Sequence, residues 1–185
     1  MRKKIVAMIV IGLIFALYAS YTVYDNWVNR SDSEVTESDN EGVNLKPEIG
    51  TRRNNVALDF TLQNLEGKEV KLTDYFGKSI VLNFWSSDCP PCRDEMPALD
   101  EFYLNNKDNI VVIGVNLGQD ISTVRDFINE GGYSFPILLD TKVLVAQTYG
   151  IMYMPTTYFI NEDGIIEDIH IGLLTLEDLQ KRYNK

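Results

Sequence analysis

Residues 80–92 read Ile-Val-Leu-Asn-Phe-Trp-Ser-Ser-Asp-Cys-Pro-Pro-Cys, and this stretch decides the fold. Its first six residues form a short apolar run rich in strand formers, which predicts a buried strand. The residues after Cys89 have the spacing of a helix, so this cysteine is predicted at a helix N-terminus. Unpaired N–H groups and the positive end of the helix dipole stabilise an anion at such a position, which favours a thiolate. Cys89 is therefore the predicted nucleophile.

The second cysteine of the stretch, Cys92, lies one helical turn further along and on the same side of the helix. From there it can attack a mixed disulfide formed on Cys89, so it is the predicted resolving thiol. The chain has two cysteines and one histidine, His170. It cannot supply the four ligands of a structural zinc site alone, and no metal is predicted. A purely structural disulfide is the other alternative, although closing so short a loop removes little entropy from the unfolded chain.

The helical period places one carboxylate, Glu95, on the apolar face of the predicted helix. The other residues of that face are Cys92, Met96, Leu99, Phe102 and Tyr103. A carboxylate one turn past Cys92 can take or give a proton during thiol exchange, particularly where burial raises its pKa. An ordinary glutamate that extends into water from the border of the buried face gives the same pattern, and the helical period does not separate the two.

The N-terminal segment, residues 1–24, begins with a basic cluster and continues as an apolar run from residue 5. Roughly twenty apolar residues are enough to cross a bilayer as a helix. A transmembrane anchor is therefore predicted, with its basic end in the cytoplasm and the rest of the chain outside. The alternative is a cleaved signal peptide, which the bulky Leu17 and Tyr18 before Ala19 disfavour. Either interpretation exports the remainder of the chain.

Two further segments follow the predicted anchor. Residues 25–46 are polar and acidic with few apolar side chains, which predicts a flexible tether. Residues 47–185 have the length and apolar content of one catalytic domain. The formal net charge is −10, from 27 acidic and 17 basic residues. This charge argues against a nucleic-acid partner.

Strand-like and helix-like segments alternate along the domain. Hairpins are predicted over 60–72 and 156–171, buried strands over 79–85 and 110–116, and helices from the dithiol to about 105 and over 121–130, 142–149 and 175–183. Apolar strands that alternate with helices predict an α/β domain in which a central sheet is covered on both faces.

In these features the chain resembles thioredoxin-fold proteins and, more closely, the membrane-anchored ResA/TlpA group of extracytoplasmic thiol-disulfide oxidoreductases. The resemblance covers about residues 55–185. It rests on three motifs in order: Phe84-Trp85 before the dithiol, Glu95-Met96-Pro97 after it, and Met154-Pro155-Thr156-Thr157 before the second hairpin. It implies a thioredoxin-like fold with a central mixed sheet, helices on both faces, an N-terminal hairpin and a central insertion that includes residues 135–140.

The resemblance also implies roles for individual residues. It makes Met154-Pro155 a cis peptide bond that faces the disulfide, with the Met154 backbone pairing to a substrate peptide. Glu95 matches the active-site glutamate of the group, and Trp85 and Pro91 join the substrate-binding residues.

Two departures from the wider pattern matter. Asn83 stands where plain thioredoxin has a buried aspartate, so Glu95 becomes the better proton acceptor. Asp88 stands where many relatives have tryptophan directly before the first cysteine. Its negative charge opposes the thiolate of Cys89 and favours a reducing dithiol.

The predicted function is an enzyme that reduces or exchanges disulfides in exported proteins and is recharged by a membrane thiol-electron donor. It needs no cofactor beyond the Cys89–Cys92 disulfide. In ResA-like proteins the client is often the haem-attachment site of an apocytochrome c. One alternative is a thiol peroxidase, because Ser86 lies three residues before Cys89 as in peroxiredoxins. Another is a Sco-type copper-delivery protein, although its Cys-x-x-x-Cys spacing is one residue longer than the spacing here.

Overall fold

The computed structural model describes residues 18–22, 24 and 47–183. The chain falls into two units, Met1–Leu45 and Lys46–Lys185. In the first unit the described residues are helical. The rest of the predicted anchor and the predicted tether lie outside the described residues. Among those that are described, no helix combines the length and the hydropathy that a membrane span requires.

The second unit is built on a seven-stranded sheet with the strand order β4-β3-β7-β6-β5-β8-β9. Strands β5, β6 and β7 run parallel, and every other pairing in this sheet is antiparallel. The mixed sheet that the family resemblance implies is therefore present. Its strands are β3 Thr61–Asn64, β4 Glu69–Lys71, β5 Ser79–Trp85, β6 Ile110–Leu117, β7 Ile137–Asp140, β8 Thr156–Ile160 and β9 Ile166–Ile171. A separate parallel pair is formed by β1 Ile49–Gly50 and β2 Val56–Ala57.

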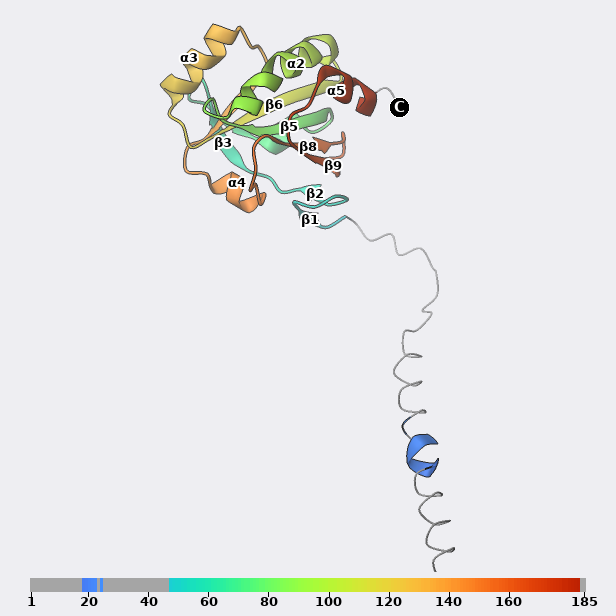
Figure 1. The fold of residues 1–185 in the computed structure, drawn as a ribbon. Coiled ribbons are helices and arrows are strands. Elements are labelled where there is room, and N and C mark those ends of the chain that lie inside the picture. The colour runs from blue at the N-terminus through green and yellow to red at the C-terminus, as the bar shows by residue number, and fades with distance from the viewer. Residues whose placement is uncertain (1–17, 23, 25–46, 184–185) are drawn as a thin grey trace, which may run out of the picture. The chain divides into compact units, whose positions relative to one another are not determined.

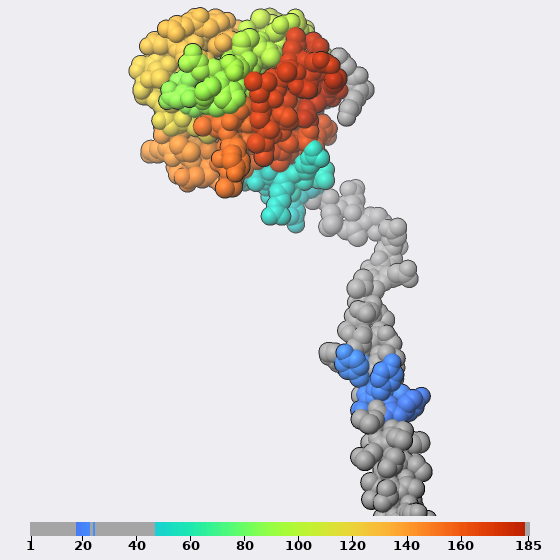
Figure 2. All heavy atoms as spheres, in the orientation of Figure 1, coloured from blue at the N-terminus to red at the C-terminus, as the bar shows by residue number. Residues whose placement is uncertain are grey.

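Helices cover both faces of the sheet, as predicted. The helical elements are η1 Leu72–Tyr75, α2 Pro90–Asn106, α3 Ile121–Gly131, α4 Leu144–Thr148 and α5 Leu176–Tyr183. Buried residues of α2, α3 and α5 share one core with one face of the sheet, and those of η1 and α4 share the other. On the molecular surface α2 (green) lies beside α3 (yellow) and α5 (red) (Figure 2).

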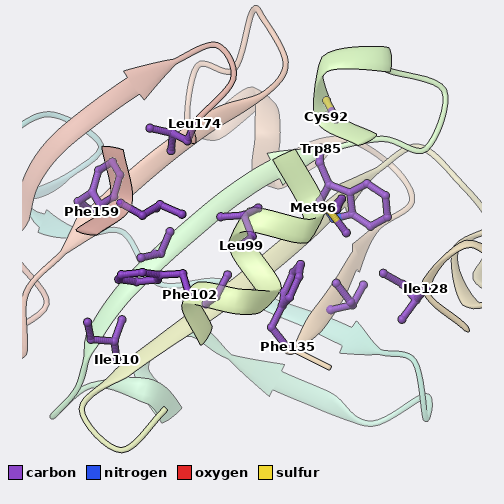
Figure 3. Packing of buried hydrophobic residues seen from close by; sticks show 14 of the residues in the cluster. Trp85, Cys92, Met96, Leu99, Phe102, Ile110, Ile128, Phe135, Phe159 and Leu174 are labelled. Carbon is purple, nitrogen blue, oxygen red and sulfur yellow. The ribbon is translucent and has the colours of Figure 1, made fainter. Parts of the chain in front are cut away.

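The apolar face of α2 forms the centre of the first core (Figure 3). Met96, Leu99 and Phe102 point from the helix towards the sheet, where they join Phe159 of β8. Cys92 lies in this same core at the start of the helix, and its side chain is fully buried. Tyr103 is only partly buried and packs against both cores.

The alignment of β5 with β6 determines which loops meet near the dithiol. The two strands are parallel, and Trp85 at the end of β5 is paired with Asn116. The loops that follow both strands therefore leave the same edge of the sheet, where α/β proteins commonly form ligand sites. β8 runs antiparallel to β5, with Phe84 paired to Thr156, so the chain before β8 reaches this edge as well.

One central strand was not predicted. Residues 135–140 were assigned only to an insertion, but β7 Ile137–Asp140 lies inside the sheet between β3 and β6. Its four residues are all buried. A run this short shows no clear alternation, and its pairing partners come from distant parts of the chain, Gln63 of β3 among them.

Candidate active site

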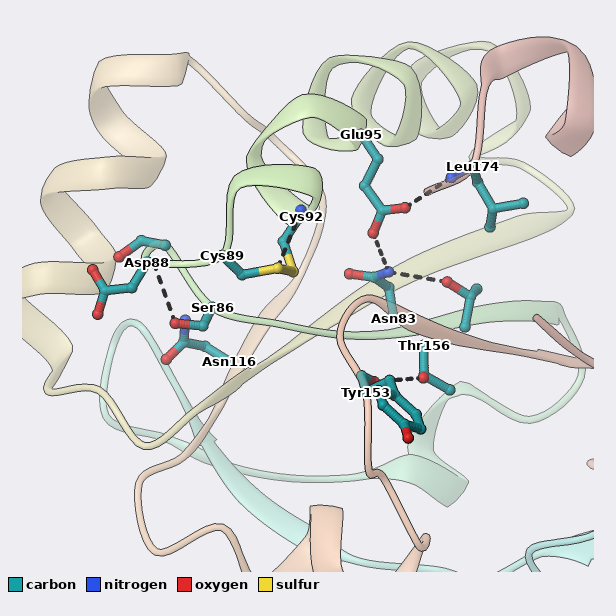
Figure 4. Close-up of a disulfide and its surroundings, with 12 residues drawn as sticks. Asn83, Ser86, Asp88, Cys89, Cys92, Glu95, Asn116, Tyr153, Thr156 and Leu174 are labelled. Atoms are coloured by element: carbon teal, nitrogen blue, oxygen red, sulfur yellow. Dashed lines mark hydrogen bonds between the residues drawn. A yellow bond between two sulfur atoms is a disulfide. The ribbon is translucent and has the colours of Figure 1, made fainter. Parts of the chain in front are cut away.

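Cys89 and Cys92 form a disulfide at the N-terminus of α2, with their Cα atoms 5.2 Å apart. Cys89 is the N-cap of the helix, and the backbone N–H of Cys92 donates to its sulfur at 3.3 Å. The N–H of Arg93 donates to the Cys89 carbonyl at 3.1 Å. The local sequence produces this cap, because an N-cap side chain accepts from the N–H two or three positions into the helix. The predicted position of Cys89 is confirmed (Figure 4).

The two prolines between the cysteines occupy the first two positions of α2. Proline is favourable at the start of a helix because the N–H that it lacks would have no partner there. The first N–H of this helix is consequently that of Cys92. An anion on the Cys89 sulfur therefore has fewer helix N–H donors than at an ordinary helix N-terminus.

The two cysteines differ in their access to solvent. Cys89 is partly exposed, whereas Cys92 is 0% exposed. A client sulfur can thus approach Cys89 from solvent, while Cys92 is reached only from within the protein.

Glu95 is fully buried one turn beyond Cys92, so the interpretation of this residue as a glutamate extending into water is wrong. Its Oε1 accepts a hydrogen bond from Asn83 Nδ2 at 2.6 Å, and its Oε2 accepts from the backbone N–H of Leu174 at 3.0 Å. Burial raises the pKa of Glu95 to about 7, although the hydrogen bonds from Leu174 and Asn83 act in the opposite direction. The carboxyl group can therefore exchange a proton near neutral pH.

Asn83 links this carboxylate to the next strand. It lies in β5, and its Nδ2 also donates to Thr157 Oγ1 in β8 at 3.0 Å. Its Oδ1 is buried and has no hydrogen-bond partner among the described residues. Figure 4 shows Asn83 and Leu174 on different sides of the Glu95 carboxyl group. Asn83 and the Leu174 N–H thus hold the carboxyl group from two segments, and Thr157 of a third segment positions Asn83.

The Met154-Pro155 peptide bond is cis, as the resemblance implies. Pro155 is buried, and its carbonyl accepts from the N–H of Gly172 at 2.9 Å, which joins this loop to the end of β9. Thr156 Oγ1 donates to the Tyr153 carbonyl at 2.7 Å (Figure 4). Exposed apolar side chains gather on the two joined segments. This apolar border comprises Met152, Tyr153, Met154, Ile171 and Leu173.

The other two predicted substrate-binding residues, Pro91 and Trp85, differ from each other in exposure. Pro91 is exposed beside the disulfide. Trp85 is fully buried and packs against Phe127 in a tilted arrangement with ring centroids 5.3 Å apart, so its side chain offers no surface to a client. We correct its assignment to a supporting residue, which packs with Cys92 and Met96 under the start of α2 (Figure 3).

Several polar residues of the site were not predicted as contributors. The apolar strands 79–85 and 110–116 each carry one asparagine, Asn83 and Asn116, and both are fully buried. A polar residue in an otherwise apolar strand is a signal that sequence reasoning can use. Nothing in the sequence indicates Gln119, whose side chain contacts the loop before Cys89.

The features cited for the two alternative functions occupy ordinary structural positions. Ser86 is buried, and its Oγ accepts the Asp88 N–H at 3.3 Å within the turn before Cys89. His170 lies in β9 beside the Leu173 carbonyl. In the described part of the chain, no three residues of the types that ligate metals come together.

A cystine at the start of α2, with a cis-proline at the same edge of a mixed sheet, defines a thiol-disulfide oxidoreductase of thioredoxin-like fold. Comparisons with known proteins give the particular family. The AhpC/TSA family model matches residues 54–169. Thiol-disulfide oxidoreductase ResA of Geobacillus thermodenitrificans is 33% identical over 181 residues, which are 97% of this chain and 94% of that protein. The chain belongs to the AhpC/TSA family and groups with the ResA thiol-disulfide oxidoreductases.

Two Bacillus subtilis proteins extend the comparison. Thioredoxin-like protein YneN is 38% identical over 140 residues, which cover 74% of this chain and 82% of that protein. The crystal structure of StoA aligns with a TM-score of 0.59 at 35% identity and covers 66% of this chain and 94% of that chain. The protein is therefore an enzyme of thiol-disulfide exchange that acts on disulfide-bearing client proteins.

Proposed function

We propose that this oxidoreductase reduces disulfides in exported proteins, with Cys89 as the attacking thiol and Cys92 as the resolving thiol. The observation that carries the proposal is the difference in exposure between the two sulfurs, because only Cys89 is open to a client from solvent. The cap position of Cys89 supports the same assignment, since a thiolate there accepts the Cys92 N–H.

The reaction proceeds in two exchanges. The Cys89 thiolate attacks one sulfur of the client disulfide, and the other client sulfur leaves as a thiolate. Glu95 then accepts the proton of the Cys92 thiol, and the resulting thiolate attacks Cys89 and expels the second client sulfur. Two electrons pass from the dithiol to the client, and two protons complete the two client thiols. A pKa of about 7 suits Glu95 to this transfer, because the group is partly ionised near neutral pH.

The client lies across the apolar border as an extended segment. Among the residues that the structure describes, no hydrogen bond involves the N–H or C=O of Met154. The Met154 backbone is therefore available to pair with a client strand. The exposed side chains of Tyr153 and Ile171 flank this position from the two joined segments. Apolar client residues beside the cystine are accordingly favoured. Among such clients we include the haem-attachment cysteines of apocytochrome c, on the basis of the family resemblance.

The dithiol acts as a reductant. Asp88 places a negative charge next to Cys89, and the two prolines remove N–H donors that a thiolate would use. Both effects favour the disulfide over the reduced form. The reduction potential is expected nearer to the roughly −270 mV of thioredoxin than to the roughly −120 mV of a strong oxidant. A membrane thiol-electron donor outside the cytoplasm returns the cystine to the dithiol, and the N-terminal segment anchors the enzyme beside it.

Trapping experiments test the assignment of the two cysteines. In cells that express the full-length Cys92→Ser variant, mixed disulfides with clients should accumulate, because the adduct on Cys89 has no nearby thiol to resolve it. The Cys89→Ser variant should trap none. Equal trapping by both variants would contradict the assignment. The trapped proteins identify the clients, and a wild-type potential above about −180 mV would exclude the reducing direction.

A further inference from the structure

Gln119 makes three hydrogen bonds to the loop that carries the nucleophile and a fourth to Asn116 of β6. Its Oε1 accepts from the Ser87 N–H at 2.9 Å and from Asn116 Nδ2 at 2.8 Å. Its Nε2 donates to Ser87 Oγ at 2.8 Å and to the Asp88 carboxylate at 3.2 Å. Both ends of the amide are thus fully engaged. A carboxylate can only accept and a Lys or Arg side chain can only donate, so neither a charged nor an apolar side chain could make these four hydrogen bonds.

The fold holds this amide firmly in place. The loops after β5 and β6 leave the same edge of the sheet, so residues 86–89 and 117–120 are neighbours. Gly118 turns the chain with a φ of 71°, and its N–H donates to the Asp140 carbonyl at 3.1 Å. Asp120 then caps α3. Gln119 is therefore anchored on both sides, and Asn116 below it is fully buried.

The contact with Asp88 determines where that charge lies. Asp88 is exposed, and its side chain would otherwise be free to rotate towards the sulfur of the next residue, Cys89. In Figure 4 the Asp88 carboxylate points away from the disulfide. The donor Nε2 of Gln119 holds it in this orientation. A negative charge opposes a nearby thiolate, and the effect falls with distance.

We propose that Gln119 is a positioning residue for thiol-disulfide exchange, which restrains the Asp88 carboxylate and thereby limits its opposition to the Cys89 thiolate. The proposal rests on the role of Cys89 as the attacking thiol. The loop after β6, which carries Gln119, would then influence the reduction potential of the dithiol at the start of α2. Gln119 acts through Asp88 and does not itself touch the client.

A double-mutant cycle on the purified full-length protein tests this coupling. We expect Gln119→Ala to make the dithiol more reducing, by about fivefold in its equilibrium constant with glutathione, which is about 20 mV at roughly 30 mV per tenfold. The Cys89 thiolate should form at a higher pH. Asp88→Asn removes the charge but keeps an oxygen that accepts from Gln119. In this background, Gln119→Ala should leave the potential unchanged.

Gln147→Ala is the matched control, because Gln147 is an exposed glutamine on α4. It should leave the potential at the wild-type value. A merely structural role of Gln119 would lower the thermal unfolding midpoint in both backgrounds but would not make the change in potential depend on Asp88. An unchanged potential in Gln119→Ala, or an equal shift with and without the Asp88 charge, overturns the proposal. Neither result bears on client trapping by Cys92→Ser, so the two proposals fail separately.

Discussion

At position 95 a carboxyl group occupies a place that helical spacing assigns to an apolar side chain. The cost of burying it is reduced by two donors, Asn83 Nδ2 and the Leu174 N–H. Asn83 suits this role because its amide can turn. With Nδ2 towards Glu95 it donates to the ionised form, and with its unpartnered Oδ1 turned there it can accept a hydrogen bond from the O–H of the neutral form. An aspartate at position 83 would instead place a second charge against the first.

Glu95→Gln should retain the fold and slow disulfide exchange. The introduced amide fills the same volume and can pair with Asn83, but it cannot take the proton of Cys92. We expect the rate of peptide-disulfide reduction to fall by about a hundredfold, within the roughly 10²–10⁴ typical of general acid-base groups. The step in the pH–rate profile near pH 7 should disappear. Stopped-flow measurements from pH 5 to 9 give both results.

The control for this variant is Glu101→Gln, an exposed glutamate on the same helix. It removes the same charge from α2 without touching the buried network. Its profile should match that of the wild type. A step near pH 7 that persists in Glu95→Gln would assign the titration to another group.

The buried position of Glu95 shows what could be predicted at this scale. Its place on the apolar face follows from spacing along one helix. Its hydrogen-bond partners do not, because Asn83 and Leu174 are 12 and 79 residues away in the chain. Tertiary folding brings these two residues to Glu95, and the sequence around Glu95 does not predict such long-range contacts. The choice between a buried acid and a glutamate in water therefore required the structure.

Among the elements, the start of α2 was predicted most completely, because all its determinants are local. The N-cap, the two prolines and the donor N–H lie within four consecutive residues, 89–92. The local environment of the Cys89 sulfur is thus determined by the sequence of one helix end. β7 is the opposite case, because it exists only through its pairing with β3 and β6.

Replacing Pro91 tests how the helix end sets the potential. Pro91→Ala restores an N–H at the second helical position, where an N-cap side chain finds a donor. The thiolate of Cys89 should gain a hydrogen bond, which stabilises the reduced form. We expect the potential to rise by about 30 mV, which corresponds to about 1.4 kcal/mol for a two-electron couple. Equilibration with glutathione redox buffers measures this shift.

Pro90→Ala provides the comparison at the first helical position. The N–H there is not a usual partner of the N-cap side chain, so the potential should move much less. Similar shifts in the two variants would mean that flexibility of the helix start, and not the restored donor, controls the potential.

For the molecule as a whole, the mixed sheet explains why the site lies at one edge. Parallel β5 and β6 bring two loops to this edge, and antiparallel β8 brings the cis-proline loop to it. The turn after β9 completes the site through the Leu174 N–H. The alternation of strands and helices predicted this architecture in outline. Which side chains meet at the edge depends on register, and no local pattern reveals the register of parallel strands.

The stability of the oxidised protein should depend on pH through Glu95. Burial raises its pKa in the native state from 4.5 to about 7. Between these values the native protein holds a proton that the unfolded chain has lost. The stabilisation is therefore fully present below pH 4.5 and is lost as pH rises through about 7. The loss amounts to about 3 kcal/mol at about 1.4 kcal/mol per pKa unit.

Urea unfolding of the oxidised full-length protein at pH 5 and pH 8 measures this dependence. Other ionisable groups also contribute to the slope, but the difference in unfolding free energy between wild type and Glu95→Gln cancels the contributions that the two proteins share. Relative to wild type, the variant should become more stable by about 2–3 kcal/mol on going from pH 5 to pH 8, because at pH 5 the unfolded glutamate is already mostly ionised. Glu101→Gln should show no such change. A difference between wild type and Glu95→Gln that stays constant across this range would mean that the buried carboxyl group does not titrate near neutral pH, and its role in proton transfer would then have to be given up.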